Sequence, residues 1–413
     1  MNIFETRRKK VFDQMEDNSL LFVFSSNAPY ATADEKYPFQ VNRNFYYLTN
    51  LEIENAVLVL RKTMNTCVET LFIERFDEVL AKWVGARMLP AEATELSGIQ
   101  RISYIDELES TVGGLIRIPS HYDPVCYFNF EKQDFNQPNN EEQEFALKLK
   151  NTYPNIILKN SYPITTSLRI EKDELEIENM RKAIAITNNG LQRVMKTIEA
   201  GKYEYQVENE FNYSLLNEGC RKFAFKTIAA SGINATVLHY SDNNCVIPEN
   251  SLMLFDLGAT YSNYNADISR TYPVSGKFTE RQKEIYNIVL ECNLYIIDHC
   301  KVGTTLGKLN QLSIEFFQKR LAEVGLLENG KTVRDYYFHS IGHMLGLDTH
   351  DVSLANYVLR EGNIITVEPG LYIEDEAIGI RIEDDVLITK NGPVVLSKDI
   401  IKTVEDIENF MAK

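Results

Sequence analysis

Two aspartates, Asp256 and Asp267, lie in a segment that is typical of a β-hairpin, because two apolar runs flank a short polar stretch. The two residues are eleven apart, and direct opposition predicts a four-residue loop at about Thr260–Asn263, an acceptable hairpin length. Side chains opposed on one face have Cβ atoms about 5 Å apart. Two carboxylates at that distance repel each other unless a cation lies between them or one stays protonated. The spacing therefore indicates either a metal site or a shared proton.

Two glutamates, Glu368 and Glu383, form a second acidic pair. They are fifteen apart, another odd spacing that permits direct opposition of two residues in a hairpin. Arg381 and Glu383 share one face of the alternating run Ile380–Glu383. A Pro-Gly pair after Glu368 interrupts the first strand, so the turn between the glutamates is left open. We expect one hairpin with two facing carboxylates in each half of this region.

Three of the six histidines fall between the two acidic pairs, within the thirteen residues from His339 to Asp351. His339 and His343 are four apart, but Ser340 stands where a zinc-protease motif needs glutamate, so a zincin is rejected. Four carboxylates and one histidine make an oxygen-rich site, which suits Mn²⁺, Co²⁺ or Fe²⁺ better than a structural zinc. Four negative charges roughly neutralise two divalent cations, which favours a dinuclear centre.

Each of these residues also has an ordinary structural explanation when taken alone. An isolated aspartate pair on a strand is usually solvated or ion-paired, since aspartate is mostly an exposed residue. A single histidine near glycine is usually structural, and His121 and His299, which have no motif around them, are assigned no function. The order Asp, Asp, His, Glu, Glu along one chain is what favours a metal centre.

The elements that must position these residues fall into two parts. Residues 1 to about 165 alternate strand-like and helix-like runs, which predicts an α/β domain that ends near Pro163. The expected strands are Leu20–Phe24, Ala56–Arg61, Glu69–Glu74, Arg101–Asp106 and Cys126–Phe130, and the expected helices include Thr6–Met15 and Asp77–Arg87.

Residues 166 to 413 show a repeated order of elements. A helical pattern from Asp173 stops at Gly201, a second ends near Gly219, and strand-like segments follow. The order then recurs, with a capping-box pattern at Thr279–Gln282 that opens one helix and a further helix at about Leu306–Val324. Two helices followed by strands, twice over, predict two similar halves. The whole chain is therefore assigned to the α/β (α+β) class.

Composition limits the classes of function. The net charge of −16 and the pI of about 5.0 argue against binding nucleic acid through a basic surface. No run of about 18 apolar residues is present to span a membrane, and the start MNIFETRRKKVFDQM is too polar for a signal peptide. Six cysteines without a CxxC pair are too sparse for a disulfide framework, so a cytoplasmic protein with reduced thiols is expected.

The run FDLGATYSNYNADISRTYPVSGKFT, followed by HSIGHMLGLDTHD, TVEPGLYI and GIRIEDDVLI, resembles the pita-bread metallopeptidases, which include aminopeptidase P, prolidase and methionine aminopeptidase. The resemblance covers essentially the whole chain. It implies a C-terminal pita-bread domain whose pseudo-two-fold halves surround an antiparallel sheet. It also implies two divalent metal ions, with Mn²⁺ favoured over Co²⁺, Fe²⁺ or Zn²⁺. The residues that match the family's metal ligands are Asp256, Asp267, His343, Glu368 and Glu383.

The resemblance implies further roles in the site. His239, in ASGINATVLHYSDNN, and His350 match substrate histidines, which we expect to stabilise a developing oxyanion. Glu368 is expected to shuttle a proton from the attacking water to the leaving nitrogen. His339 matches a further pocket histidine and Arg381 matches the arginine before the last ligand, so both are expected to bind substrate.

The segment Asp34–Glu52 resembles the N-terminal domain of aminopeptidase P, which methionine aminopeptidases generally lack. Residues 1–165 would then form that domain and residues 166–413 the catalytic one. The implied activity is removal of the first residue of a peptide whose second residue is proline. The lone tryptophan, Trp83, lies in a segment similar to one that reaches a neighbouring subunit's pocket, and relatives form dimers or tetramers, so a homo-oligomer is expected.

Three alternatives stay open. A prolidase shares the ligands but takes only dipeptides, and activity on a dipeptide against a tripeptide separates it from aminopeptidase P. A creatinase-like hydrolase works without metal, and a non-catalytic protein of this fold would be expected to have lost ligands. Five matching ligands disfavour these last two, while the short stretch between Glu368 and Glu383 leaves the preferred substrate length open.

Overall fold

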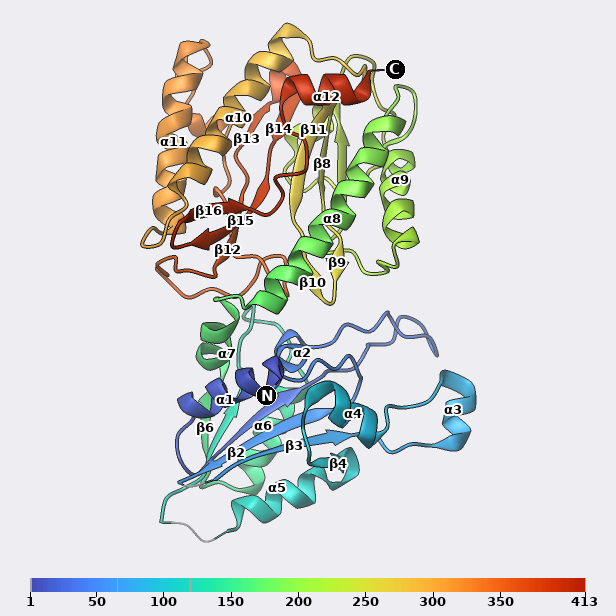
Figure 1. Ribbon diagram of the computed structural model, residues 1–413, viewed down its shortest axis with the longest axis vertical. Coiled ribbons are helices and arrows are strands. Elements are labelled where there is room, and N and C mark those ends of the chain that lie inside the picture. The colour runs from blue at the N-terminus through green and yellow to red at the C-terminus, as the bar shows by residue number, and fades with distance from the viewer. Residues whose placement is uncertain (1, 65, 119–120, 413) are drawn as a thin grey trace. The chain divides into compact units, whose positions relative to one another are not determined.

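The computed structural model describes residues 2–64, 66–118 and 121–412 and divides into two compact units, one ending at Arg169 and the other beginning at Ile170 (Figure 1). Helix α7 (Tyr162–Arg169) ends the first unit, and Arg169 donates a buried hydrogen bond of 2.9 Å to Asn44. Pro163 lies in the first turn of α7, where a proline is tolerated because that backbone position has no helical acceptor.

The first unit is built on a six-stranded mixed sheet in the order β4-β3-β2-β1-β5-β6. Its strands are β1 (Ser19–Phe24), β2 (Val57–Thr63), β3 (Thr66–Ile73), β4 (Ile102–Tyr104), β5 (Val125–Phe128) and β6 (Ile157–Asn160). Its other helices are α1 (Ile3–Gln14), α2 (Arg43–Thr49), α3 (Glu78–Val84), α4 (Pro90–Ser97), α5 (Leu108–Ile116) and α6 (Glu141–Thr152). The five predicted strands and two predicted helices are confirmed with small differences at their ends. β6 was not among the predictions, because it is a short edge strand with little buried surface.

The sheet of the first unit is covered on both faces. α5 and α6 pack their apolar residues against one face, where the rings of Phe22 and Phe128 stack with centroids 4.6 Å apart. On the other face, Arg8 of α1 pairs with Glu69 of β3 at 2.9 Å, and Lys62 of β2 donates to carbonyls at the end of α1. Coverage on both faces explains why the strands of this domain show apolar runs rather than strict alternation.

The second unit repeats two helices followed by strands, as predicted. The first half contains α8 (Glu174–Thr197), α9 (Glu204–Asn217), β7 (Ile228–Ser231), β8 (Leu252–Leu257), β9 (Thr260–Tyr261), β10 (Tyr264–Asn265) and β11 (Ile268–Pro273). The second contains α10 (Glu280–His299), α11 (Leu306–Glu323), β12 (Ile364–Val367), β13 (Gly370–Ile373), β14 (Ile378–Arg381), β15 (Asp384–Thr389) and β16 (Gly392–Val395), with α12 (Val404–Met411) at its end. The two helix pairs flank the strands in Figure 1.

Local sequence signals set the ends of these helices. The capping box predicted at α10 is present: Thr279 Oγ1 accepts from the Gln282 amide at 3.2 Å, and Gln282 Oε1 accepts from the Thr279 amide at 2.9 Å. Asp173 and Glu176 form the same reciprocal pair at the start of α8. The described residues also form short 3₁₀ helices, namely η1 (Ile105–Glu107), η2 (Gly232–Thr236), η3 (Val333–Asp335) and η4 (Glu374–Glu376).

The hairpin of the first half has a register different from the predicted one. Asp256 lies opposite Ser269 rather than Asp267, and the connection is the two-residue turn Ser262–Asn263 instead of a four-residue loop. Both turn residues have positive φ, 49° and 62°, the conformation that matches the twist of two paired strands. Direct opposition of the aspartates is therefore wrong. A shift of two residues preserves the face of a strand, however, so both aspartates keep the same face.

The register of the second hairpin is the predicted one. Val367 lies opposite Asp384, and Gly370 lies opposite Arg381, so the same pairing continues on both sides of the two glutamates. At that point each strand changes its hydrogen-bond partner. The amide of Glu368 donates to Ile341 O at 2.9 Å, and the amide of Glu383 donates to Ser269 O at 3.0 Å. The glutamates thus lie where the second half meets the first half and the histidine loop.

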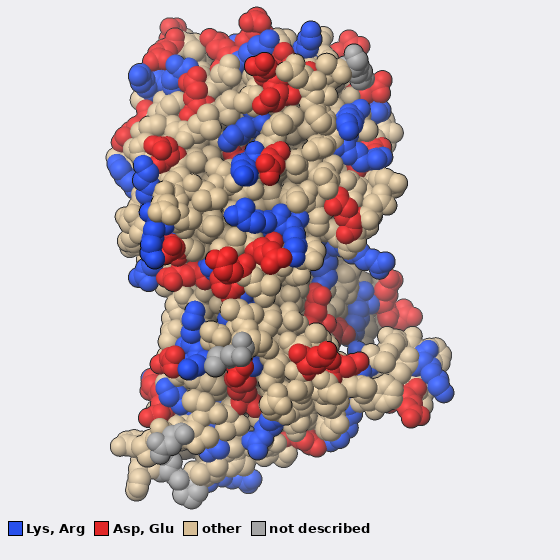
Figure 2. Space-filling model, in the orientation of Figure 1, with Lys and Arg blue, Asp and Glu red and all other residues tan. Residues whose placement is uncertain are grey.

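The surface carries both signs of charge. On the face shown in Figure 2, Lys and Arg side chains are interspersed with Asp and Glu, which leaves no continuous basic strip there. Within the described ranges, every helix is too short or too polar to span a bilayer. The six cysteines are free, and Cys292 and Cys300 are buried.

Candidate metal centre

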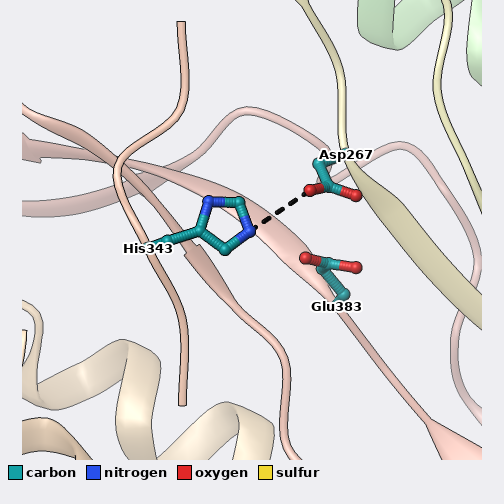
Figure 3. A group of neighbouring side chains, drawn as sticks. All are labelled: Asp267, His343 and Glu383. Atoms are coloured by element: carbon teal, nitrogen blue, oxygen red, sulfur yellow. Dashed lines mark ion pairs between the residues drawn. The ribbon is translucent and has the colours of Figure 1, made fainter. Parts of the chain in front are cut away.

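Asp267, His343 and Glu383 converge in the second unit (Figure 3). Each offers one ligand atom, and these three atoms lie within 4.8 Å of one another. Both carboxylates are buried and the imidazole is partly buried, with His343 Nε2 3.4 Å from Asp267 Oδ2. Asp267 directly precedes β11, His343 lies in the loop before β12, and Glu383 lies at the junction of β14 with β15. The fold thus collects donors that are far apart in the sequence.

The histidine loop is fixed against β12 at close range. His343 N donates to Thr366 Oγ1 at 3.0 Å, and Thr366 N donates to His343 O at 2.9 Å. A Cβ atom on Gly342 would lie 2.1 Å from Thr366 O, so only glycine permits this approach. His343 Nδ1 lies 3.0 Å from Met344 O, and donation there leaves the lone pair of Nε2 free toward the carboxylates.

Glu368 and Asp256 border the cluster. Glu368 Oε1 lies 3.6 Å from His343 Nε2, so the imidazole faces two carboxylates at once. Asp256 Oδ2 accepts from Arg381 Nη2 at 2.7 Å. Its other oxygen, Oδ1, is buried and has no hydrogen-bond partner among the described residues. An unsatisfied buried carboxylate oxygen at the edge of an acidic cluster fits a position for a cation.

The electrostatics of the cluster favour a cation. Burial, reinforced by neighbouring carboxylates, raises the pKa of Asp267 and of Glu383 well above their usual values. Burial also raises the pKa of Glu368 to about 8, although the charge of Arg381 opposes the shift. Burial lowers the pKa of His343 to about 4, so this imidazole is neutral at pH 7. The carboxylates must therefore hold protons or metal ions, and the histidine is in the form that ligates a metal.

Metal removal should make the stability of the protein depend on pH. The pKa values of Asp267, Glu368 and Glu383 are raised by folding, so the folded chain without metal binds more protons than the unfolded chain. Its free energy of unfolding should therefore fall as pH rises from 4.5, the ordinary value, through about 8. The manganese-loaded protein should lack this fall, because the cations favour the ionised carboxylates. Thermal unfolding at several pH values, with and without chelator, measures the pH dependence of stability of the metal-free and the manganese-loaded protein. The same pH dependence in both would contradict the expectation.

Two further histidines, His350 and His339, lie beside the cluster. The ring of His350 is exposed, with its centroid 4.3 Å from that of His343. His339 Nδ1 lies 2.7 Å from Ser340 O and 3.7 Å from Glu368 Oε2. Burial, followed by the charges of Arg381 and His239, lowers the pKa of His339 to about 3. His239 is exposed, and its neighbours Leu238 and Tyr240 pack against the apolar cluster that contains Tyr372, whose hydroxyl lies 2.9 Å from His339 Nε2.

Arg381 is buried and connects the two acidic pairs. Its Nη2 donates to Asp256, its Nη1 to Tyr372 Oη at 2.9 Å, and its Nε to Ser269 Oγ at 2.7 Å. Ser269 Oγ in turn donates to Glu383 Oε2 at 2.7 Å. Sequence reasoning identified Arg381 but missed Ser269 and Tyr372. Each of these two residues lies an even number of positions from a predicted ligand on an extended segment, which is the spacing that places side chains on one face.

A wholly buried ion pair supports the backbone of the site. Arg270 Nη2 lies 2.9 Å from Asp384 Oδ1, and Lys402 Nζ lies 2.6 Å from Asp384 Oδ2. Burial by itself would raise the pKa of Asp384, but the charges of Arg270 and Lys402 lower it to about 2. Arg270 Nη1 also donates to the carbonyls of Ser269 and Glu383. The pair therefore fixes the strand junction that carries Glu383.

Comparison with known proteins agrees with this geometry. The sequence model of Metallopeptidase family M24 matches residues 178–390, and that of the Aminopeptidase P N-terminal domain matches residues 4–122. The Xaa-Pro aminopeptidases of Escherichia coli (strain K12) and Haemophilus influenzae are each 31% identical to this chain over 99% of its length and cover 97% and 96% of their own.

Solved structures show the same two-domain fold. A structure from Bacillus anthracis is 42% identical and has a TM-score of 0.96, over 99% of this chain and 97% of that one. Aminopeptidase P from E. coli with the inhibitor Pro-Leu is 31% identical with a TM-score of 0.90, over the same shares of the two chains. The α/β class, with an N-terminal domain before a C-terminal pita-bread domain, is thereby confirmed. The chain belongs to metallopeptidase family M24 and carries the N-terminal domain of the aminopeptidase P type.

Proposed function

We propose that this chain is a metal-dependent Xaa-Pro aminopeptidase, which hydrolyses the peptide bond before a proline in the second position of a peptide. The convergence of Asp267, His343 and Glu383 within 4.8 Å carries the proposal, because it forms a metal-binding donor set. The relatives that match nearly the whole chain are named Xaa-Pro aminopeptidases, which supports specificity for proline and disfavours a prolidase.

We place two divalent cations, with Mn²⁺ favoured, on the five acidic and histidine ligands Asp256, Asp267, His343, Glu368 and Glu383. The oxygen-rich donor set supports this choice of metal. Asp256 Oδ1 has no hydrogen-bond partner among the described residues and would gain a bound cation as its partner. This supports including Asp256 among the five ligands. Bound divalent cations supply a water that ionises near neutral pH and a Lewis acid for the scissile carbonyl.

The residues of the chain would handle protons and charge around that chemistry. Glu368 would accept the proton of the attacking water and pass it to the leaving nitrogen. His350 and His239 would donate hydrogen bonds to the developing oxyanion. His339 and Arg381 would shape the substrate pocket, Arg381 by fixing the carboxylate of Asp256.

The chemistry of the X–Pro bond explains why a dedicated enzyme is needed. An X–Pro amide has no N–H and a fixed ring, so peptidases that bind that N–H handle it poorly. A pocket shaped for the ring can select such bonds. The substrate is therefore a peptide whose second residue is proline.

Hydrolysis of Xaa-Pro-Yaa tripeptides and Xaa-Pro dipeptides, before and after chelation and with Mn²⁺ restored, tests the proposal. Metal-dependent cleavage of the tripeptide is expected. Cleavage of the dipeptide alone would make the protein a prolidase. Failure to cleave either peptide, in protein shown to hold two metal ions, would refute specificity for proline.

His350→Ala should lower kcat on the tripeptide by about 10²-fold while leaving the metal content unchanged, since it removes one oxyanion donor and no ligand. Metal analysis and steady-state kinetics on the same preparation measure both effects. His299→Ala is the matched control, because that partly buried histidine at the end of α10 contacts Tyr295 and lies outside the site. Loss of metal from His350→Ala would show instead that His350 is a ligand.

We further infer that the protein forms a homo-oligomer, a dimer or a tetramer. α3 of the first unit exposes Trp83 at 83%, Val79 at 67% and Val84 at 64% of their surfaces. Neighbouring exposed apolar side chains of this size are typical of an interaction surface. The six free thiols support a reducing, cytoplasmic location.

A further inference from the structure

The segment Ser231–Cys245 carries His239 and has little regular structure of its own. Beyond η2 it contains no helix or strand, and its own backbone bonds there are turn bonds, such as that from Tyr240 N to Val237 O at 3.3 Å. Leu238 and Tyr240, on either side of His239, pack against the apolar cluster that contains Tyr372. His239 itself stays exposed. The segment therefore needs anchors from outside to hold the imidazole in one place.

A single carboxyl group supplies those anchors. Glu204, the first residue of α9, is completely buried, and all five hydrogen bonds to its carboxyl oxygens come from this segment. Oε1 accepts from Ser231 N at 2.7 Å, Ser231 Oγ at 2.7 Å and Asn234 Nδ2 at 3.0 Å. Oε2 accepts from Tyr240 Oη at 2.7 Å and Cys245 N at 3.0 Å. One side chain thus joins the two ends of the segment and the residue next to His239.

The backbone and a second glutamate of α9 extend this anchor. The amide of Glu204 donates to Cys245 O at 3.0 Å. Glu208, one helical turn further along, accepts from Asn243 Nδ2 at 2.9 Å, and Asn243 Oδ1 accepts from Ala229 N at 3.0 Å. Residues four apart share one face of a helix, so one face of α9 holds both the outgoing and returning parts of the segment.

The anchored segment is connected to the metal centre through Tyr372. Its ring belongs to the cluster that supports Leu238 and Tyr240, while its hydroxyl lies 2.9 Å from His339 Nε2 and accepts from Arg381. Stability of the fold does not by itself require a carboxyl group at this position. Replacement of a buried polar network by apolar residues of similar volume is often neutral or stabilising.

We propose that Glu204 is a positioning residue, which holds His239 at the metal centre without touching the substrate. The proposal rests on the oxyanion role given to His239 in the proposed function. A displacement of about 1 Å at a reacting group costs up to about 10²-fold in rate, so loosening this segment should be visible in turnover.

Glu204→Gln tests the proposal with a side chain of the same shape. Whichever way the new amide turns, its NH₂ group meets the backbone N–H of Ser231 or of Cys245, so one end of the segment loses its acceptor. With manganese bound, kcat/KM on an Xaa-Pro-Yaa tripeptide should fall by about tenfold to 10²-fold with the metal content unchanged. Glu210→Gln, on the same helix and paired with Arg193 near the surface, should keep wild-type kinetics.

The double variant Glu204→Gln/His239→Ala separates positioning from a general structural effect. If Glu204 acts through His239, the double variant should be no slower than His239→Ala alone. The proposal would be overturned if Glu204→Gln slows the His239→Ala variant as much as it slows the wild type. It would also be overturned if Glu204→Gln alone has wild-type kinetics. If Glu204→Gln does not fold, Tyr240→Phe removes one bond and keeps the ring packing, and the same comparison is made with it.

Hydrogen exchange tests whether Glu204 holds the segment of His239 in place, and this test does not depend on activity. The amides of residues 237–241 should exchange faster in Glu204→Gln than in the wild type, and at the wild-type rate in Glu210→Gln. Unchanged exchange in Glu204→Gln would overturn the proposal whatever the kinetics. Absence of tripeptide cleavage by the wild type would instead refute the proposed function, and faster exchange would still support the anchoring of His239 by Glu204.

Discussion

Asp267→Asn should reduce kcat/KM on Xaa-Pro-Yaa tripeptides by at least about 10³-fold and lower the metal content of the purified protein. Asparagine keeps the shape of the side chain but removes the negative charge that lies within 4.8 Å of His343 and Glu383 donors. Bound metal contributes several kcal/mol of transition-state stabilisation, and each 1.36 kcal/mol is about tenfold in rate. Elemental analysis and steady-state kinetics on one preparation measure both losses.

The same variant distinguishes loss of metal from loss of fold. Without metal, Asp267 is a buried carboxyl group whose ionisation is opposed first by burial and then by Glu383 and Asp256. Its replacement by a neutral amide should therefore make the chelated protein more resistant to heat than chelated wild type at pH 8. Asp375→Asn is the control, because that residue is exposed in η4, in the hairpin that carries Glu368 and Glu383, and should leave activity and metal unchanged. If Asp267→Asn keeps full activity and two bound metal ions, Asp267 is not a metal ligand.

Arg270→Met should lower the free energy of unfolding of the second unit by about 3–5 kcal/mol, the cost of leaving one partner of a buried ion pair without the other. Arg270 and Asp384 are both fully buried, and Arg270 also donates to the backbone carbonyls of Ser269 and Glu383. Methionine fills part of the volume but leaves those acceptors without their donor. Chemical denaturation of the chelated protein, followed by circular dichroism, measures the loss.

An exposed ion pair of the same unit provides the control. Lys390 and Glu361 lie 2.7 Å apart, but 77% and 51% of their side chains are exposed. Solvent screens such pairs, so Lys390→Met should leave the unfolding transition where it is. Arg270→Met should also bind manganese more weakly, because the junction that carries Glu383 loses its support. Unfolding curves that coincide for the two variants would show that the buried pair does not stabilise the site.

The register of the hairpins shows how far local sequence determines the site. The odd spacing of Glu368 and Glu383 predicted the pairing that the flanking strands adopt. The same reasoning was wrong by two residues for Asp256 and Asp267, because a turn of two residues with positive φ replaced the expected loop. The carboxylates still share a face, since a strand returns to the same face every second residue.

Sequence patterns did not predict the contacts between residues that are far apart in the chain. Nothing in the sequence near Glu204 or Arg270 indicated a buried side chain that holds distant segments together. Both act through hydrogen bonds to partners tens of residues or more away. Such contacts depend on how helices and sheets pack, and packing is decided by the whole set of apolar faces rather than by any local run.

The sequence by itself determined the donor types, their order along the chain, the capping box at Thr279 and the repeated order of helices and strands. These features depend on neighbouring residues, whose side-chain periodicity and hydrogen bonds are local. Only the tertiary structure decided that His343 meets Asp267 and Glu383, because that meeting depends on the close approach of Gly342 to β12 and on the bond from Glu383 N to Ser269 O. Those contacts join segments separated by tens of residues, so they form only when both halves of the domain are packed together.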